Sequence, residues 1–210
     1  MAAASPVEAM LVATRNPGKV RELLPLLTDA GYRPVSLSVA GLAEEPGEDA
    51  LEVHETFEEN ALAKARWFFR RGGGVITLAD DSGLAVKALG GAPGVRSKRF
   101  SGSPLSGQAL DDENNRALMR ALAGVARREA RYVAAAAIVW AGGEVVARGE
   151  CAGRIVDVPR GEQGFGYDPY FRSDELAMTF GEAVRAAKER VSHRGRAVRK
   201  ALELLAARLA

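Results

Sequence analysis

The sequence predicts an α/β fold built on a mixed β-sheet, and three observations predict this class. Strand and helix patterns alternate through residues 9–79, two strand patterns joined by a short turn occupy residues 131–153, and residues 181–210 have a helical pattern. Strands that alternate with helices pair in parallel, whereas strands joined by a tight turn pair antiparallel, so the sheet should be mixed. A chain of 210 residues is long enough for one large domain, and we expect a single domain over residues 1–210.

The first three expected elements form a strand–helix–strand unit. Residues 9–14 (AMLVAT) are a short apolar run that ends in a turn, which predicts a buried strand. Residues 19–30 place leucine and valine side chains at helical spacing and are followed by Gly31, a typical helix end. Residues 33–39 then predict a second strand.

A helix and a buried strand are expected next. Residues 57–71 have apolar side chains on one helical face, and the three glycines at 72–74 stop the helix. Residues 75–79 are mainly apolar and predict a buried strand. We expect this strand to end where the acids Asp80 and Asp81 begin.

The second half of the chain predicts a helix followed by a hairpin. Residues 112–122 have a helical pattern, and Asp111 is the expected cap of that helix. Residues 131–140 and 144–153 have strand patterns, and the glycine-containing segment 141–143 between them predicts a hairpin turn. The C-terminal helical region is expected to break at a polar segment, SHRG, at residues 192–195.

Composition narrows the functional classes. The sequence is 47% hydrophobic and 27% charged, which is ordinary for a folded globular protein. The net charge is only +2, from 29 basic and 27 acidic residues, so a long nucleic acid would not be held by overall charge. The basic residues gather near polar loops, and this distribution favours a small anionic ligand.

Cysteine and hydrophobic patterning bear on the compartment. The single cysteine, Cys151, excludes a disulfide within the chain and favours a reducing compartment. The sequence has no run of about 18 apolar residues that would span a membrane, and its N-terminal apolar stretch lacks a basic leader. We therefore expect a cytoplasmic protein with no membrane partner.

The segment GFGYDPYF, at residues 164–171, is the most informative one in the chain. Glycines flank one aromatic ring, and an acid stands beside a second ring. Glycine lets the backbone come close to a ligand, and aromatic rings offer flat faces on which a planar molecule can stack. The segment therefore predicts a ligand-binding loop.

The segment TRNPGK, at residues 14–19, joins the first strand to the first helix. A helix N-terminus together with a lysine is a natural phosphate site. Ala13 and Val20 stand where a nucleotide-binding P-loop would have glycine and a hydroxyl residue, so that motif is not matched. From these residues alone, a phosphate site and an ordinary strand–helix connection are both open.

Acids and a lysine suggest where a metal ion and phosphate could bind. The segment DDSG at residues 80–83 follows a buried strand, and open α/β sheets bind ligands at such strand ends. Magnesium prefers carboxylate ligands, often only one or two of them, although a simple turn or helix cap is the alternative. Lys64 lies one helical turn after Asn60, so both side chains project from one face of the expected helix. That face could contribute to a binding site or could simply be solvated.

Taken together, these segments resemble the inosine triphosphate pyrophosphatase family (Ham1/RdgB-like noncanonical purine nucleotide hydrolases). The matching segments occur in family order and are ATRNPGKVREL (13–23), TFEENALAKAR (56–66), ADDSGLAVKALGGAPGVRSKRFSG (79–102), GFGYDPYF (164–171) and SHRGRA (192–197). The resemblance implies magnesium-dependent cleavage of ITP, dITP or XTP to the monophosphate and pyrophosphate. It also implies an elongated two-lobed α/β fold with a long central mixed sheet flanked by helices, an active-site cleft between the lobes, and a homodimer.

The resemblance also implies roles for individual residues. The triphosphate would be held by Thr14, Arg15, Asn16, Pro17, Gly18 and Lys19. The rest of the nucleotide would be bound by Ser82, Phe165, Gly166, Tyr167, Asp168, Lys188, His193 and Arg194. Asp81 would bind Mg²⁺ and activate water. By its spacing from Phe57, Glu52 is the expected second metal ligand, with Glu44 and Glu45 as alternatives.

The expected mechanism is electrostatic. Lys19, Lys64 and the metal would offset phosphate charge, and Asp80 or Asp81 would act as the general base, a choice that the sequence leaves open. Two other functions are compatible with some of these segments: a Maf-like nucleotide pyrophosphatase, and a nucleotide-binding protein without catalysis. The segments GFGYDP and SHRG argue against the first, and the paired acids, which repel phosphate without a metal, argue against the second.

Overall fold

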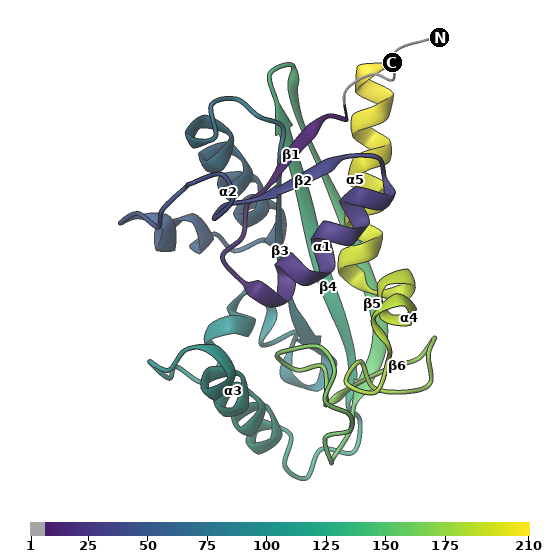
Figure 1. Cartoon of the computed structure of the whole chain (residues 1–210). Helices are drawn as coiled ribbons and strands as arrows, with labels where there is room; N and C mark the ends of the chain where they lie inside the picture. The colour runs from purple at the N-terminus through teal and green to yellow at the C-terminus, as the bar shows by residue number, and fades with distance from the viewer. Residues whose placement is uncertain (1–6) are drawn as a thin grey trace. The chain divides into compact units, whose positions relative to one another are not determined.

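The computed structural model describes residues 7–210 and contains one six-stranded sheet flanked by helices (Figure 1). The strands are β1 (Ala9–Val12), β2 (Arg33–Ser36), β3 (Thr77–Val86), β4 (Glu129–Trp140), β5 (Gly143–Ile155) and β6 (Phe171–Ser173). The α-helices are α1 (Pro17–Asp29), α2 (Phe57–Arg71), α3 (Gly107–Ala121), α4 (Arg185–Val191) and α5 (His193–Leu209), and the short 3-10 helices are η1 (Glu48–Glu52), η2 (Lys87–Leu89) and η3 (Gly94–Arg99).

The sheet is mixed, which confirms the predicted fold class. Its strand order is β2-β1-β3-β4-β5-β6. β1 pairs in parallel with both β2 and β3, and β5 pairs antiparallel with β6. β4 and β5 are neighbours joined by two residues, the connection length of a tight hairpin, so the hairpin predicted at 141–143 is present.

The chain divides into two compact units. Unit 1 contains Met1–Asp80, Ala135–Ala147 and Val198–Ala210, and unit 2 contains Asp81–Ala134 and Arg148–Ala197. Along the chain the division falls inside β3, β4, β5 and α5, so these four elements contribute residues to both units. A single domain with two lobes remains a prediction.

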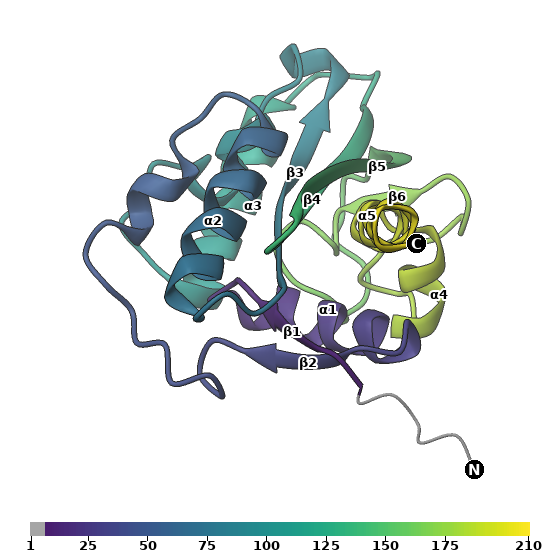
Figure 2. The ribbon, with the colours of Figure 1, turned by 90° about the horizontal axis from the view of Figure 1, so that it is seen from above.

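Unit 1 includes the predicted strand–helix–strand segment. β1 and β2 run side by side, and α1 contacts both strands (Figures 1 and 2). Met10, Leu11 and Val12 of β1 are buried, as are Leu23 and Leu27 of α1. Leucines one helical turn apart give α1 the apolar face that this contact requires.

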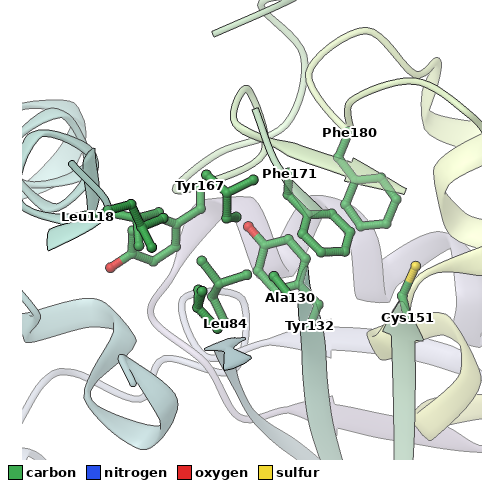
Figure 3. Packing of buried hydrophobic residues seen from close by; sticks show 11 residues of the cluster. Leu84, Leu118, Ala130, Tyr132, Cys151, Tyr167, Phe171 and Phe180 are labelled. Atoms are coloured by element: carbon green, nitrogen blue, oxygen red, sulfur yellow. The ribbon is translucent and has the colours of Figure 1, made fainter. Parts of the chain in front are cut away.

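Unit 2 contains an aromatic core. Tyr132 stacks on Phe180 and makes an edge contact with Phe171, with ring centroids 5.8 Å and 4.6 Å apart. Tyr167 and Leu118 belong to the same cluster of buried side chains and lie close together (Figure 3). Tyr167 and Phe171 of the GFGYDPYF segment belong to this core, so part of that segment packs in the interior.

Local sequence signals located one helix to the residue. The predicted helix at 57–71 is confirmed as α2. The Thr56 hydroxyl accepts a hydrogen bond from the backbone N–H of Glu59, which caps the first turn, and Gly72 follows the last one. Both end signals are local, and this explains why the sequence placed the boundaries correctly.

Two boundaries were predicted wrongly. The strand at 75–79 was expected to end before the two acids, but β3 runs on to Val86 and contains Asp80 and Asp81. The helix expected at 112–122 begins at Gly107, so Asp111 lies inside α3 and is not its cap. For β3, the low strand propensity of the polar residues 80–83 is overridden by their place in a buried strand.

Smaller differences concern the acidic segment and the C-terminal helices. The acidic segment at 44–52, which contains the three metal-ligand candidates, ends in the 3-10 helix η1. The predicted break at 192–195 is confirmed but is narrower, because α4 ends at Val191 and α5 begins at His193. Within residues 7–210, none of the helices combines the length and apolar character of a membrane span. Figure 2 looks down the axis of α5.

Candidate functional site

Two lysines and two acids from separate segments meet in unit 1. The Lys19 Nζ atom lies 3.2 Å from the Asp80 carboxylate and 3.3 Å from its backbone carbonyl oxygen. The Lys64 Nζ atom donates to the same carbonyl at 2.6 Å and pairs with the Glu52 carboxylate, also at 2.6 Å. We call these four residues (Lys19, Glu52, Lys64 and Asp80) the lysine cluster. It places two ammonium groups and two carboxylates side by side.

The end of β1 explains why Lys19 can reach Asp80. The last β1–β3 pair is Val12 with Leu78, so Asp80 lies two residues beyond the paired part of β1. The chain leaves β1 at that point and enters the loop before α1. Lys19 in the first turn of α1 therefore extends its side chain toward β3, and Asp80 is fully buried there.

The loop at 14–19 is ordered by its own side chains. Asn16 caps α1, and its Oδ1 atom accepts hydrogen bonds from the backbone N–H groups of Gly18 and Lys19 at 2.8 Å and 3.2 Å. The Thr14 hydroxyl accepts one from the N–H of Asn16 at 3.2 Å. The N–H groups of the helix start are thus engaged by Asn16, and Pro17 has none. The Asn16 and Thr14 side chains therefore hold this loop in a defined conformation.

Arg15 performs a different task from the rest of that loop. Its guanidinium donates to both carboxylate oxygens of Glu48, at 2.9 Å and 2.8 Å, and to the carbonyl oxygens of Leu42 and Ala43. The hydrogen bond to Glu48 raises the pKa of Arg15, and the same bond lowers the pKa of Glu48. Arg71 also contacts Glu48 and the Ala43 carbonyl. The two arginines therefore fasten the 42–48 segment to the loop before α1 and to the end of α2.

Sequence reasoning missed Glu48 and Arg71 as partners of Arg15. Glu48 lies in the acidic stretch from which Glu44, Glu45 and Glu52 were selected as metal-ligand candidates. Of those three, Glu45 binds Arg71 at 2.6 Å, and Glu52 is the one that pairs with Lys64. No local pattern distinguishes these acids, because their partners are distant in sequence.

Asp80 and Asp81 are adjacent in β3 and therefore leave opposite faces of the strand. Asp80 is 0% exposed, and Asp81 is 7% exposed. Asp80 belongs to unit 1 and the lysine cluster, whereas Asp81 is the first residue of the next part of the chain. The two carboxylates consequently have different surroundings, which is a basis for different roles.

A second group of predicted residues meets in unit 2 around Phe165. Lys188 Nζ lies 2.6 Å from Asp168 Oδ2, and both side chains are almost fully buried. The same carboxylate oxygen accepts a hydrogen bond from the backbone N–H of Phe165 at 2.8 Å. The half-buried Phe165 ring has two cations near its centroid, Lys188 at 5.3 Å and Arg194 at 5.6 Å.

Two further predicted residues, His193 and Arg194, begin α5 directly after the break at Ser192. Arg194 donates a hydrogen bond to the Ser82 hydroxyl at 2.8 Å. The His193 ring stacks on Tyr132, with centroids 4.5 Å apart and an interplanar angle of 8°. The Ser192 hydroxyl accepts from the N–H of Gly195 and so caps α5. We call Ser82, Phe165, Asp168, Lys188, His193 and Arg194 the Phe165 cluster.

Tyr167 lies in the core and not beside these groups. It is 5% exposed, and its hydroxyl donates to the backbone carbonyl of Ser97 at 2.8 Å. Burial raises the pKa of this phenol. Of Phe165 and Tyr167, the two rings expected to bind the nucleotide, Phe165 is therefore the more accessible one.

The Glu52 carboxylate of the lysine cluster is of the ligand type that magnesium prefers. In the part of the chain that the structure describes, no three His, Cys, Asp or Glu residues are grouped as a metal cage. Magnesium needs no such cage, because it binds one or two carboxylates together with substrate phosphates and water. Lys64 already holds the Glu52 carboxylate, so the side chain is oriented before any ligand arrives.

The chain matches the model of the Ham1 family over residues 10–204. It is 48% identical to the dITP/XTP pyrophosphatase of Nocardia farcinica over 94% of this chain and 95% of the relative. It is 49% identical to the enzyme of the same name from Mycolicibacterium paratuberculosis, covering 94% and 97% of the two chains. Among solved structures, the Ham1 protein of Staphylococcus aureus superposes with a TM-score of 0.77 at 29% identity, covering 96% of this chain and 100% of that one.

Proposed function

This chain belongs to the Ham1 family and is a nucleoside triphosphate pyrophosphatase, and we propose that its lysine cluster binds the triphosphate while its Phe165 cluster binds the purine base. It hydrolyses noncanonical purine nucleoside triphosphates (ITP, dITP and XTP) to the monophosphate and pyrophosphate. The observation that carries our assignment is the convergence of Lys19 and Lys64 on Asp80. Family membership favours this function over the Maf-like and non-catalytic alternatives.

The lysine cluster supports phosphoryl transfer by charge and position. Phosphoryl transfer needs little covalent assistance from the protein, and most of the catalysis comes from positioning and from offsetting negative charge. Lys19 and Lys64 are held by the Asp80 carbonyl and so present their ammonium groups in fixed places. Because these places are set before the substrate binds, little reorganisation is needed when charge develops.

Mg²⁺ is the proposed cofactor, and from the family motifs alone we propose Asp81 and Glu52 as its ligands. A divalent ion would offset phosphate charge and lower the pKa of a bound water toward neutrality. Within the chain, we assign the attacking water to Asp81 and a supporting role to Asp80. Asp80 is fully buried and engaged by Lys19, whereas Asp81 retains some exposure.

The Phe165 cluster supports recognition of a purine in two ways. The Phe165 ring offers a stacking face, which any purine can use. Arg194 and the backbone near His193 offer donors for the 6-oxo group of hypoxanthine or xanthine, whereas adenine has a 6-amino donor at that position. A donor that meets another donor is left without a partner, so the wrong base is disfavoured.

The direct test is pyrophosphate release from ITP, dITP, XTP, ATP and GTP, with magnesium and after chelation. We expect release from the first three, little from ATP, and none without a divalent ion. Guanine also carries a 6-oxo group, so little release from GTP would require a second contact, for which Asp168 is the candidate. Equal turnover of ATP and ITP would contradict the base assignment, and release unaffected by chelation would contradict the metal assignment. A homodimer and a cytoplasmic location are further proposals, and light scattering of the purified protein tests the first.

A further inference from the structure

The loop that carries Phe165 is a tight turn closed by its own residues. The N–H of Asp168 donates to the Phe165 carbonyl at 3.2 Å, and the N–H of Phe165 donates to the Asp168 carboxylate. A side chain at Gly164 would meet that carboxylate, since a Cβ atom there would lie 2.1 Å from Asp168 Oδ2. These contacts fix the conformation of the turn. Its position relative to the rest of unit 2 depends on contacts with other elements.

Helix α3 supplies that support through a single residue of the turn. The Asp111 carboxylate accepts the backbone N–H of Gly166 at 3.0 Å. The Asn115 side-chain amide donates to the backbone carbonyl of the same Gly166 at 2.9 Å. Both polar groups of Gly166 are therefore held by two side chains spaced i and i+4 on one face of the helix.

The two residue types match this task. A carboxylate accepts hydrogen bonds, as the Gly166 N–H requires, and an amide NH₂ group donates, as the Gly166 carbonyl requires. Reversing the two residues would place an acceptor against the carbonyl. Burial raises the pKa of Asp111 although the Gly166 N–H opposes that change. The half-buried Asp111 carboxylate therefore has a specific partner, the Gly166 N–H.

The helix that holds the turn is itself fixed. Asn114 accepts a hydrogen bond from the N–H of Ser101 and donates to the Lys98 carbonyl. Leu118, one turn after Asn114, is buried beside Tyr167 in the unit 2 core (Figure 3). The position of α3 is therefore passed to the turn at Gly166 and, through the adjacent peptide bond, to Phe165.

We propose that Asp111 and Asn115 are positioning residues that set the place of the Phe165 ring and thereby the affinity for the purine base. This inference rests on the proposed function, in which Phe165 stacks on the base. Stacking accepts any purine. Loss of either contact should therefore raise KM for ITP and for ATP by the same factor, leave kcat within about twofold, and preserve the ratio between the two nucleotides.

The experiment compares Asp111→Ala, Asn115→Ala, Asp111→Asn and the control Asp112→Ala, which removes an exposed acid one residue away. One hydrogen bond is worth roughly 0.5–1.5 kcal/mol, so each alanine variant should raise KM about three- to tenfold. Asp111→Asn keeps a side-chain acceptor and should stay within about twofold of the wild type, as should Asp112→Ala. If an alanine variant does not fold, Asn115→Asp, which is nearly isosteric and replaces the donor by an acceptor, is used in its place.

Hydrogen exchange of residues 164–168 gives a readout that is independent of catalysis. We expect faster exchange at Gly166 in Asp111→Ala and Asn115→Ala, and wild-type exchange in Asp112→Ala. Unchanged exchange, or faster exchange with unchanged KM, overturns the inference while the wild-type activity on ITP leaves the proposed function standing. A wild-type protein that releases no pyrophosphate from ITP contradicts the proposed function, whatever the exchange data show.

Discussion

Lys64 donates a hydrogen bond to the backbone carbonyl of Asp80, with 2.6 Å between the Nζ atom and the oxygen. The lysine thereby holds the main chain of β3 at the residue that precedes Asp81. The Glu52 carboxylate pairs with the same ammonium group, at 2.6 Å. Lys64 consequently links the acidic segment to the strand that carries both catalytic candidates, in addition to any contact it makes with phosphate.

Asp81→Asn should nearly abolish hydrolysis and leave the protein folded. Removing a carboxylate that binds metal and orients water should cost several kcal/mol of transition-state stabilisation, or a loss in kcat of about 10³-fold or more. The measurement is kcat for pyrophosphate release from ITP at saturating magnesium, with the melting temperature as the folding control. Near-wild-type turnover would refute the assignment. Activity rescued by high magnesium would make Asp81 a ligand only and assign the base to Asp80.

Lys19→Ala should weaken turnover of every nucleotide alike. Lys19 is held beside Asp80 at the start of α1, where it is assigned to phosphate and not to the base. We expect kcat/KM to fall by a similar factor for ITP and for the poor substrate ATP. The control is Lys87→Ala, which removes a lysine outside the proposed clusters. A change in base preference in the Lys19 variant would show that this lysine is assigned wrongly.

Arg194→Ala should narrow the gap between ITP and ATP. The variant removes a buried donor that we assign to the 6-oxo group, and sites built on such donors discriminate by up to about 10⁴-fold. Phe165→Ala should instead lower kcat/KM for both nucleotides together, because stacking accepts either base. Measuring both substrates on both variants tests the division of roles. Full ITP preference in Arg194→Ala would place selectivity elsewhere, with Asp168 as the next residue to test.

Tyr167→Phe tests whether the buried Tyr167 has a structural role that differs from the role of the half-buried Phe165. The variant loses the hydrogen bond to the Ser97 carbonyl and leaves a buried acceptor, which should cost about 1–3 kcal/mol of unfolding free energy. Chemical denaturation measures this loss. We expect kcat/KM for ITP to stay within about threefold of the wild type, unlike in Phe165→Ala. A selective loss of ITP binding with unchanged stability would return Tyr167 to the binding surface.

Glu48→Gln should reduce stability near neutral pH and have less effect in acid. The pKa of Glu48 is lowered in the folded protein, chiefly by the hydrogen bond from Arg15, from its ordinary value of 4.5. A carboxylate with a depressed pKa stabilises the fold above its unfolded pKa, and this contribution is lost as the pH falls through the folded value. The melting temperatures of wild type and variant, measured from pH 7 to pH 3, should therefore converge toward low pH.

The matched control for that experiment is Glu144→Gln, which breaks the exposed ion pair between Arg66 and Glu144. Exposed ion pairs contribute about 0–1 kcal/mol, so this variant should shift the melting temperature less than Glu48→Gln does at pH 7. Equal shifts in the two variants would indicate that the Arg15–Glu48 contact does not fasten the 42–48 segment.

Signals within a few residues of each other allowed several element boundaries to be predicted from sequence alone. The boundaries of α2 follow from Thr56, Glu59 and the glycines at 72–74, all of which act within a few residues. The hairpin at 141–143 and the break beside Ser192 are likewise local signals. The ordered motifs identified the family and, from it, the activity, because that combination of segments is specific even where each one is weak.

Tertiary structure decided which polar side chains meet. The sequence did not indicate that Arg15 binds Glu48, which is 33 residues away, or that the Tyr167 hydroxyl donates to the Ser97 carbonyl in the core. The extension of β3 through Asp80 and Asp81, and the contact of Asp111 with Gly166, likewise depend on partners distant along the chain. Hydrogen-bond partners brought together by folding leave no periodic or local mark in a single sequence, which is why only the folded structure could assign them.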